Sequence, residues 1–230
     1  MEILKRSIPE KVFLLLVCIA ALLIPFHISL TSPPLILSAF VVLLPFGYNY
    51  KWQLLSSNRR YLFFASLYLL FLFAYFISSN KTEALHDLKI KLYILVIPLI
   101  WAACRPFSKR EIHLLLWCFV FSCIAFALFG LSRATYDLII NGENNFYYKE
   151  LVSFTVIHPS YIGMFQAFAS IIIVLDMILN WKYYSGFKKL LFVAAVILLM
   201  MFIFLLTAKM AIVSLFIFLI LLFLFGGLKL

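Results

Sequence analysis

Residues that can carry chemistry gather at two places in an otherwise apolar sequence. The stretch His158-Pro159-Ser160-Tyr161 lies near the end of a long interval, 131–165, that holds the longest polar segment of the chain. Thr207-Ala208-Lys209 interrupts a long apolar run. A lysine ammonium, a histidine N–H and a tyrosine hydroxyl can all donate hydrogen bonds, and cations bind phosphate groups strongly. These residue types predict a site for an anionic head group.

Two further cations, Arg133 and Lys91, are expected on the same face of the protein and complete the predicted substrate-binding set. Each residue of the set also has a simpler interpretation. Lys209 suits a hairpin turn, and His158-Pro159 suits an ordinary helix start, where proline is favoured. Tyr161 suits the aromatic belt of a membrane interface, and Lys91 can extend its ammonium to the surface beside a membrane span.

Several kinds of catalytic site are missing from the sequence. It has no glycine-rich phosphate loop, no H-E-x-x-H, no nucleophile elbow and no acid-rich cluster. Neither a metal nor a cofactor is therefore predicted. Asp176 is the one acid inside an apolar run, and its place near the end of that run favours an interfacial position over a functional one.

The composition is that of a polytopic membrane protein. Hydrophobic residues make up 66% of the chain and charged residues 12%, with 26 phenylalanines among 230 residues. A soluble domain has about a quarter of its residues charged. The net charge of +10 lies mostly at the ends of apolar runs. It therefore predicts helix ends anchored at a membrane surface, not a nucleic-acid partner.

The apolar runs predict an all-α fold with about eight transmembrane helices in a single domain, 1–230. The expected first turn is Thr31-Ser32-Pro33-Pro34, and the expected last turn is Thr207-Ala208-Lys209-Met210. A long loop is expected on the outer side of the membrane at about 132–158, which the resemblance described below makes periplasmic. The expected spans are 12–30, 35–46, 61–78, 92–104, 112–131 and 159–179, with two more within 190–228.

The cations indicate the orientation of these spans. With the N-terminus in the cytoplasm, 13 of the 19 lysines and arginines fall on the inner side, as the positive-inside rule requires. Five acids on the outer side balance the other six cations. These six cations are Lys81, Lys89, Lys91, Arg133, Lys149 and Lys209.

Three stretches resemble a known family, and together they cover roughly residues 60–225. His158-Pro159-Ser160-Tyr161-Ile162-Gly163-Met164-Phe165 resembles the HPxY start of a mid-chain helix in bacterial O-antigen ligases and O-antigen polymerases. Leu205-Leu206-Thr207-Ala208-Lys209-Met210-Ala211 resembles the LTxSRxx turn of that family. Lys89-Ile90-Lys91-Leu92, followed by Pro98-Leu99, is similar to its KL…xxPL pattern.

The resemblance implies a multi-pass glycosyltransferase of the bacterial inner membrane, involved in building lipopolysaccharide. Such enzymes transfer a glycan from an undecaprenyl-diphosphate-linked donor to a lipid A core or a growing polysaccharide, at the periplasmic face and without a metal. Lys209 would hold the diphosphate. The implied partners are this lipid-linked donor, the acceptor and membrane lipids.

The chain departs from the family in two ways. It has Lys209 where the family has arginine, and it lacks the later periplasmic loop that carries a further arginine and a functional histidine. An N-terminal fragment is therefore expected, and its catalytic residues stay unknown. Two other functions stay open: a non-catalytic transporter or flippase component for lipid-linked glycans, and a membrane interaction protein without a ligand site.

Overall fold

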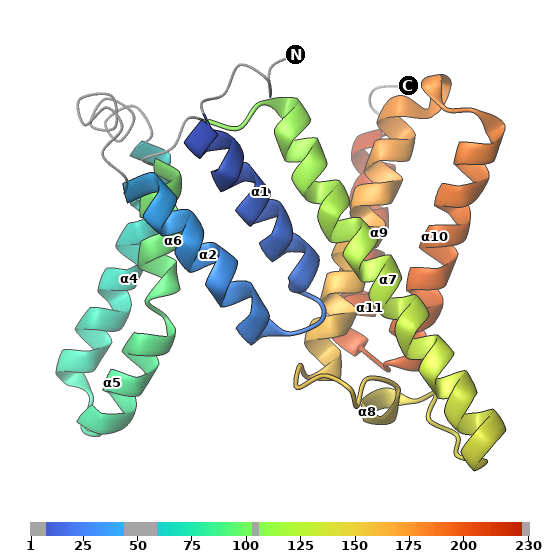
Figure 1. Cartoon of the computed structure of the whole chain (residues 1–230), viewed down its shortest axis with the longest axis horizontal. Helices are drawn as coiled ribbons and strands as arrows, with labels where there is room; N and C mark the ends of the chain where they lie inside the picture. The colour runs from blue at the N-terminus through green and yellow to red at the C-terminus, as the bar shows by residue number, and fades with distance from the viewer. Residues whose placement is uncertain (1–7, 44–58, 103–105, 227–230) are drawn as a thin grey trace. The chain divides into compact units, whose positions relative to one another are not determined.

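The structure is a computed structural model that describes residues 8–43, 59–102 and 106–226. Every regular element in these ranges is a helix, which confirms the predicted all-α class for the described residues (Figure 1). The elements are α1 Ile8–Leu23, α2 Ile28–Leu43, α4 Arg59–Ile77, α5 Lys81–Ile90, α6 Tyr93–Ala102, α7 Lys109–Asn141, α8 Tyr148–Leu151, α9 Pro159–Asn180, the 3-10 helix η2 Trp181–Tyr183, α10 Gly186–Leu205 and α11 Lys209–Gly226.

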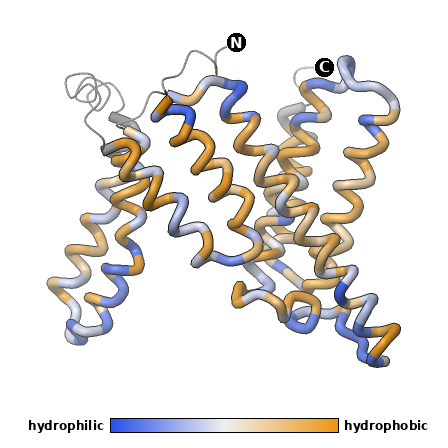
Figure 2. The backbone as a smooth tube through the Cα atoms, viewed as in Figure 1, coloured by the Kyte–Doolittle hydropathy of each residue, from blue (hydrophilic) through white to orange (hydrophobic). Residues whose placement is uncertain are grey.

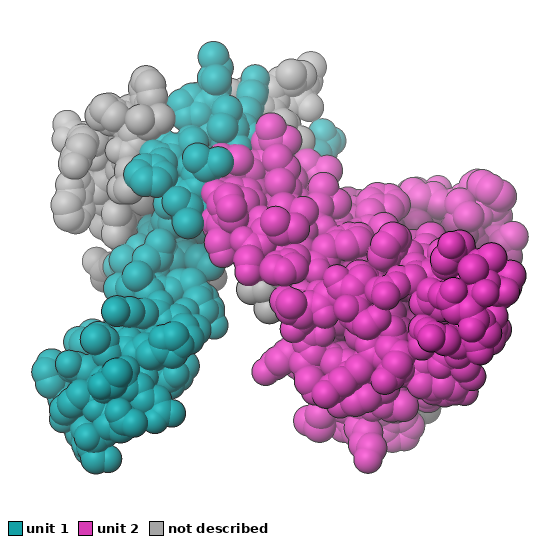
Figure 3. Space-filling model, turned by 60° about the horizontal axis from the view of Figure 1, so that its bottom comes forward, with its two compact units in different colours: residues 1–14, 36–111 teal, residues 15–35, 112–230 magenta. Residues whose placement is uncertain are grey.

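The chain separates into two compact units, coloured in Figure 3. Unit 1 comprises residues 1–14 and 36–111, and unit 2 comprises residues 15–35 and 112–230. In unit 1, α4 packs against α6 and α5. In unit 2, α9 packs against both α10 and α11. That the whole of 1–230 forms a single transmembrane domain stays a prediction.

Among the residues that the structure describes, three helices are long and apolar enough to cross a membrane: Lys109–Asn141, Pro159–Tyr183 and Gly186–Leu205. Shorter apolar helices occur at Ser29–Val42, Tyr61–Ile77 and Lys209–Leu222. Figure 2 shows that apolar residues cover most of the length of α9 and α10. These lengths and compositions fit a membrane protein, because a span needs about 20 predominantly apolar residues.

The first turn lies earlier than the sequence predicted. Helix α1 ends at Leu23, the chain turns at residues 24–27, and Pro33 and Pro34 lie inside α2. Pro25 explains the position of the turn, because proline lacks an N–H and disfavours the helical conformation of the preceding residue. His27 then caps the new helix, its Nδ1 accepting the Ser29 N–H at 3.2 Å. The predicted turn at Thr31-Ser32-Pro33-Pro34 is therefore wrong.

Helix α7 is longer than the span predicted at 112–131. It continues to Asn141 and so takes up ten residues of the stretch expected as a loop. No glycine or proline interrupts residues 132–141, and the helix ends just before Gly142, whose φ of 69° suits glycine at a helix C-terminus. The remaining segment, 142–158, holds only the short helix α8.

The break between α10 and α11 falls where the sequence predicted it. Helix α10 ends at Leu205, and α11 begins at Lys209. Between them Thr207 has a φ of 49°, a left-handed conformation in which an α-helix cannot continue. Its N–H donates to the Phe204 carbonyl at 2.9 Å, which satisfies part of the helix end.

The core of unit 2 is largely aromatic where α7, α9 and α10 meet. Phe126 of α7 and Phe202 of α10 are fully buried, with ring centroids 6.1 Å apart in an edge-to-face arrangement. Phe154, from the segment after α8, packs on Phe126 at 5.0 Å and on Phe129 at 4.8 Å. Thr155 is tied to the turn after α1, because its hydroxyl donates to the Phe26 carbonyl at 2.8 Å. The segment before α9 is thus held against the bundle.

Candidate functional site

His158 caps the N-terminus of α9. Its backbone is extended, Pro159 follows as the first helical residue, and its Nδ1 accepts the Ser160 N–H at 3.3 Å. A backbone N–H can only donate, so Nδ1 must be the unprotonated nitrogen of the neutral ring. The proton of neutral His158 is therefore on Nε2, and this exposed side chain presents an N–H donor.

Two tyrosines surround His158. The Tyr148 hydroxyl lies 3.4 Å from Nε2, and the Tyr148 ring meets the imidazole edge-to-face with centroids 6.1 Å apart. The Tyr161 ring, from the first turn of α9, also meets the imidazole edge-to-face, with centroids 6.4 Å apart. With the proton on Nε2, His158 donates to the Tyr148 oxygen, which leaves the Tyr148 hydroxyl proton free to donate outward.

Tyr148 is a site residue that the sequence did not reveal. It is exposed, and its φ of 50° is one of two positive values at non-glycine residues in the described chain. A left-handed conformation costs an L-residue about 1–2 kcal/mol. Such strain persists only where the surroundings hold the residue, and it gathers at functional sites. The sequence gives no signal for this backbone conformation.

Lys209 is the first residue of α11, and its side chain is exposed. Among the residues that the structure describes, none forms an ion pair with its ammonium. A cation at a helix N-terminus is electrostatically unfavourable, because the helix dipole is positive there. No ion pair with a described residue offsets this unfavourable interaction between the Lys209 charge and the helix dipole. A bound anion would offset it.

A close contact brings Lys209 and the His158 stretch together. A Cβ placed on Gly163, in the second turn of α9, would lie only 2.3 Å from the Ala208 Cβ and 3.4 Å from the Ala211 Cβ. Small residues permit such approaches between membrane helices. Helices α9 and α11 therefore begin side by side, at the end of unit 2 where α8 also lies (Figure 1). We call this end the α8 end.

The α8 end has the electrostatics of an anion site. The positive ends of α9, with 22 residues, and α11, with 18, meet there. Lys209 adds an unpaired cation, and Lys149 adds another whose ammonium lies 5.9 Å from the centre of the Tyr148 ring. Backbone N–H groups at helix N-termini commonly bind phosphate. Phosphate or diphosphate is the ligand chemistry that these groups fit.

Arg133 lies on α7 and is already partnered. Its Nε is 3.9 Å from the Asp137 carboxylate, and its guanidinium lies 5.8 Å from the centre of the Phe154 ring. Asp137 also accepts a hydrogen bond from Asn145 at 3.0 Å. Arg133 thus fixes the segment after α7 against that helix, and Asp137 offsets much of its charge.

Lys91 belongs to unit 1, whereas His158, Tyr161 and Lys209 belong to unit 2. It caps the C-terminus of α5, and its ammonium pairs with Asp87 at 3.0 Å. The same ammonium lies 4.6 Å from the centre of the Phe71 ring. A lysine paired in this way attracts a phosphate less strongly, because the carboxylate offsets its positive charge.

A second polar cluster lies at the opposite end of α9, around Asp176; we call it the Asp176 end. Asp176 is only 7% exposed and accepts hydrogen bonds from Tyr184 at 2.6 Å and Asn180 at 2.8 Å. His113 Nε2 lies 3.3 Å from the same carboxylate and accepts the Trp117 indole N–H at 2.9 Å. Burial and the bond to Asp176 raise the pKa of Tyr184 to about 12.

The hydrogen bond from Tyr184 to Asp176 joins the segment before α10 to α9, and His113 of α7 lies beside the same carboxylate. The interfacial position of Asp176 stays a prediction, and the structure shows in addition that its carboxylate is buried and hydrogen-bonded. Within the described ranges, no group of three or more histidine, cysteine, aspartate or glutamate side chains is arranged to hold a metal ion.

Comparison with known proteins gives no family for this chain. No family model matches it, and neither a curated protein nor a solved structure matches it.

Proposed function

We propose that the α8 end of unit 2 binds the diphosphate of a lipid-linked glycan. The observation that carries this proposal is the Gly163–Ala208 contact, which unites the His158 cap and Lys209 from distant parts of the sequence. The unpaired ammonium, the Tyr148 hydroxyl and two helix N-termini supply donors and positive charge. The neighbouring apolar helices would let a lipid tail stay in the bilayer.

The proposed class of protein is a membrane glycosyltransferase resembling the O-antigen ligases and O-antigen polymerases. Supporting this are the three motif stretches quoted above and the membrane-spanning length of α7, α9 and α10. The proposed topology has eight spans with the N-terminus in the cytoplasm of a bacterium. The α8 end then faces the periplasm, where a lipid A core or a growing polysaccharide accepts the glycan.

The proposed reaction transfers the glycan from diphosphate to a hydroxyl group. The acceptor oxygen bonds to the anomeric carbon of the glycan while the bond from that carbon to the phosphate oxygen breaks. The electron pair leaves with undecaprenyl diphosphate, and the acceptor's proton passes to a base. Lys209 and Tyr148 would stabilise the charge that grows on the leaving diphosphate.

The first test is binding of undecaprenyl diphosphate to the purified chain in lipid nanodiscs. Lys209→Ala should weaken binding by about tenfold, the effect of losing one charge-assisted hydrogen bond. Lys209→Arg should retain it, because arginine adds a bidentate donor pair. The matched control is Lys182→Ala, which removes an exposed cation beyond the other end of α9. Equal affinities of the wild type and Lys209→Ala would contradict the proposal.

A second assay separates transfer from transport. The protein is supplied with a lipid-linked glycan and an acceptor, and the product is tested for a new glycosidic bond. Movement of the lipid-linked glycan across the bilayer without bond formation would favour the transporter or flippase component. Transfer that depends on Lys209 would support the glycosyltransferase.

A further inference from the structure

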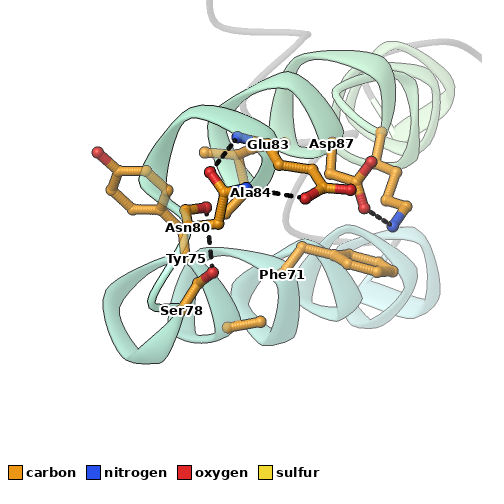
Figure 4. Close-up of a pocket in the computed structure, with 10 residues that line it drawn as sticks. Phe71, Tyr75, Ser78, Asn80, Glu83, Ala84 and Asp87 are labelled. Carbon is orange, nitrogen blue, oxygen red and sulfur yellow. Dashed lines mark hydrogen bonds and ion pairs between the residues drawn. The ribbon is translucent and has the colours of Figure 1, made fainter.

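Unit 1 contains a hollow between α4 and α5 that the proposed function does not use. Its volume is about 500 Å³, within the range of small-molecule sites. Figure 4 shows the two helices on either side, joined by the short turn at Ser78 and Asn80. None of the residues of α5 is buried, so the polar face of this helix is accessible along its length.

The walls of the hollow combine aromatic rings with carboxylates. Phe71 and Tyr75 line it from α4, and Glu83 and Asp87 line it from α5, one helical turn apart. Lys91 is the only cation among its lining residues. The lining therefore has two negative charges against one positive charge. A phosphate or another anion would be repelled, which separates this site from the α8 end.

Each carboxylate has one oxygen engaged and one oxygen open. Glu83 accepts from the Asn80 amide at 3.0 Å, and Asp87 accepts from Lys91 at 3.0 Å. Within the described part of the chain, the second oxygen of each carboxylate has no partner. Lys91 keeps further N–H donors beyond the one it gives to Asp87. A ligand rich in hydroxyl groups can donate to the open oxygens and accept from this ammonium.

One aromatic ring of the hollow is already covered by a cation of the chain itself. The Lys91 ammonium lies 4.6 Å from the centre of the Phe71 ring. A cationic ligand would meet this ammonium, so the arrangement disfavours an amine. A neutral ligand meets no such repulsion.

We infer that the hollow between α4 and α5 binds a neutral sugar residue. Sugar hydroxyls match the open carboxylate oxygens and the ammonium, and the apolar C–H face of a sugar ring matches the apolar part of the lining. The inference goes beyond the proposed diphosphate site and does not depend on it. Binding of free sugar and binding of undecaprenyl diphosphate are separate measurements, so either proposal can fail alone.

The experiment is saturation-transfer difference NMR on the whole chain with a panel of neutral monosaccharides. The panel is glucose, galactose, mannose, rhamnose and N-acetylglucosamine, each at millimolar concentration. The detergent must have no sugar head group, because an alkyl glycoside would compete for the site. At least one sugar should show saturation of its ring protons above a sample of detergent alone.

Variants then locate the binding. Asp87→Asn with Glu83→Gln should weaken it by about tenfold, because neutral acceptors make weaker hydrogen bonds, while glutamine still suits the third position of a helix. Ala84→Trp fills the hollow directly and should abolish the signal. This variant tests the site independently if the double variant is misfolded. Glu150→Gln is the matched control, an exposed carboxylate outside the hollow that should leave the signal unchanged.

Three results would overturn the inference. The first is that no sugar of the panel gives a signal above the detergent blank. The second is a signal that persists in Ala84→Trp with its helical circular dichroism intact. The third is displacement of the sugar by spermidine at equal concentration, which would identify a site for cations.

Discussion

The two ends of unit 2 use similar residue types in opposite ways. At the Asp176 end, a buried carboxylate has hydrogen bonds from Tyr184 and Asn180, and His113 lies within 3.3 Å. At the α8 end, the His158 and Tyr148 donors are exposed, and Lys209 has no ion-pair partner among the described residues.

The difference predicts which variants should change the stability of the fold and which should change the binding of an anion. Polar groups that satisfy each other inside a bundle hold helices together, and their loss leaves unpaired donors. Exposed donors without partners contribute little to folding and are available to a ligand. Variants at the Asp176 end should therefore lower stability, and variants at the α8 end should lower anion binding. The packing contact at Gly163 should affect both.

Gly163→Leu should have the largest effect. Any side chain there must displace Ala208, so α9 and the start of α11 move apart. We expect a loss of about 3 kcal/mol from overpacking and the loss of undecaprenyl diphosphate binding. Apparent unfolding temperature in detergent and lipid binding are the measurements. Gly186→Leu is the control, because nothing lies within 4 Å of a Cβ there; similar losses in both variants would refute the contact's role.

Asp176→Ala should come next. Tyr184 and Asn180 lose their charged acceptor, and we expect a destabilisation of about 2 kcal/mol with no change in undecaprenyl diphosphate binding. Thermal unfolding and lipid binding check the two parts. Glu143→Ala removes an exposed carboxylate and should change neither. Weakened lipid binding in folded Asp176→Ala would mean that the two ends are coupled.

His158→Asn should affect binding alone. Asparagine is a good N-cap, so α9 should keep its stability, but the donor that orients Tyr148 is lost. His158→Ala should also lose about 1 kcal/mol of stability with the cap. Comparing unfolding temperature and lipid affinity for both variants separates the cap from the donor. Unchanged affinity in His158→Asn would remove His158 from the site.

The smallest effect concerns alkaline pH. The pKa of Tyr184 rises from its ordinary value of 10.0 to about 12 in the folded protein, so the folded state favours the protonated hydroxyl. This contribution to stability is complete below pH 10 and is lost as the pH rises towards 12. Unfolding temperature measured across this range should fall less steeply in Tyr184→Phe than in the wild type. Identical slopes would show that the Tyr184 hydroxyl does not stabilise the fold.

Much of the helix pattern follows from the sequence. The start of α9 at Pro159 and the break before Lys209 were predicted, because proline and an isolated charge in an apolar run are strong local signals. The first turn was misplaced because it was predicted at the two prolines 33–34, which lie inside α2, whereas the chain turns at residues 24–27. Membrane helices tolerate internal proline, so proline count alone does not locate a turn.

The candidate site was only partly predictable. His158, Tyr161 and Lys209 were chosen by residue type, and the structure brings them to one end of unit 2. Tyr148 was missed because its role depends on a left-handed backbone and on the tautomer of His158. The i,i+4 spacing of Asp87 and Lys91, and of Arg133 and Asp137, is visible in the sequence, but both stretches were expected as loops, so these pairings were missed.

The contact between Gly163 and Ala208 has a consequence for biosynthesis. Helix α9 leaves the ribosome well before α11, so the His158 cap enters the membrane without its neighbour. Only when the hairpin of α10 and α11 inserts and Ala208 packs on Gly163 does Lys209 reach the same end of unit 2 as the cap. A nascent chain released before this point would contain the His158 stretch and yet lack α11 and Lys209 at the α8 end. Insertion of α10 and α11 is therefore the step of synthesis that completes the site.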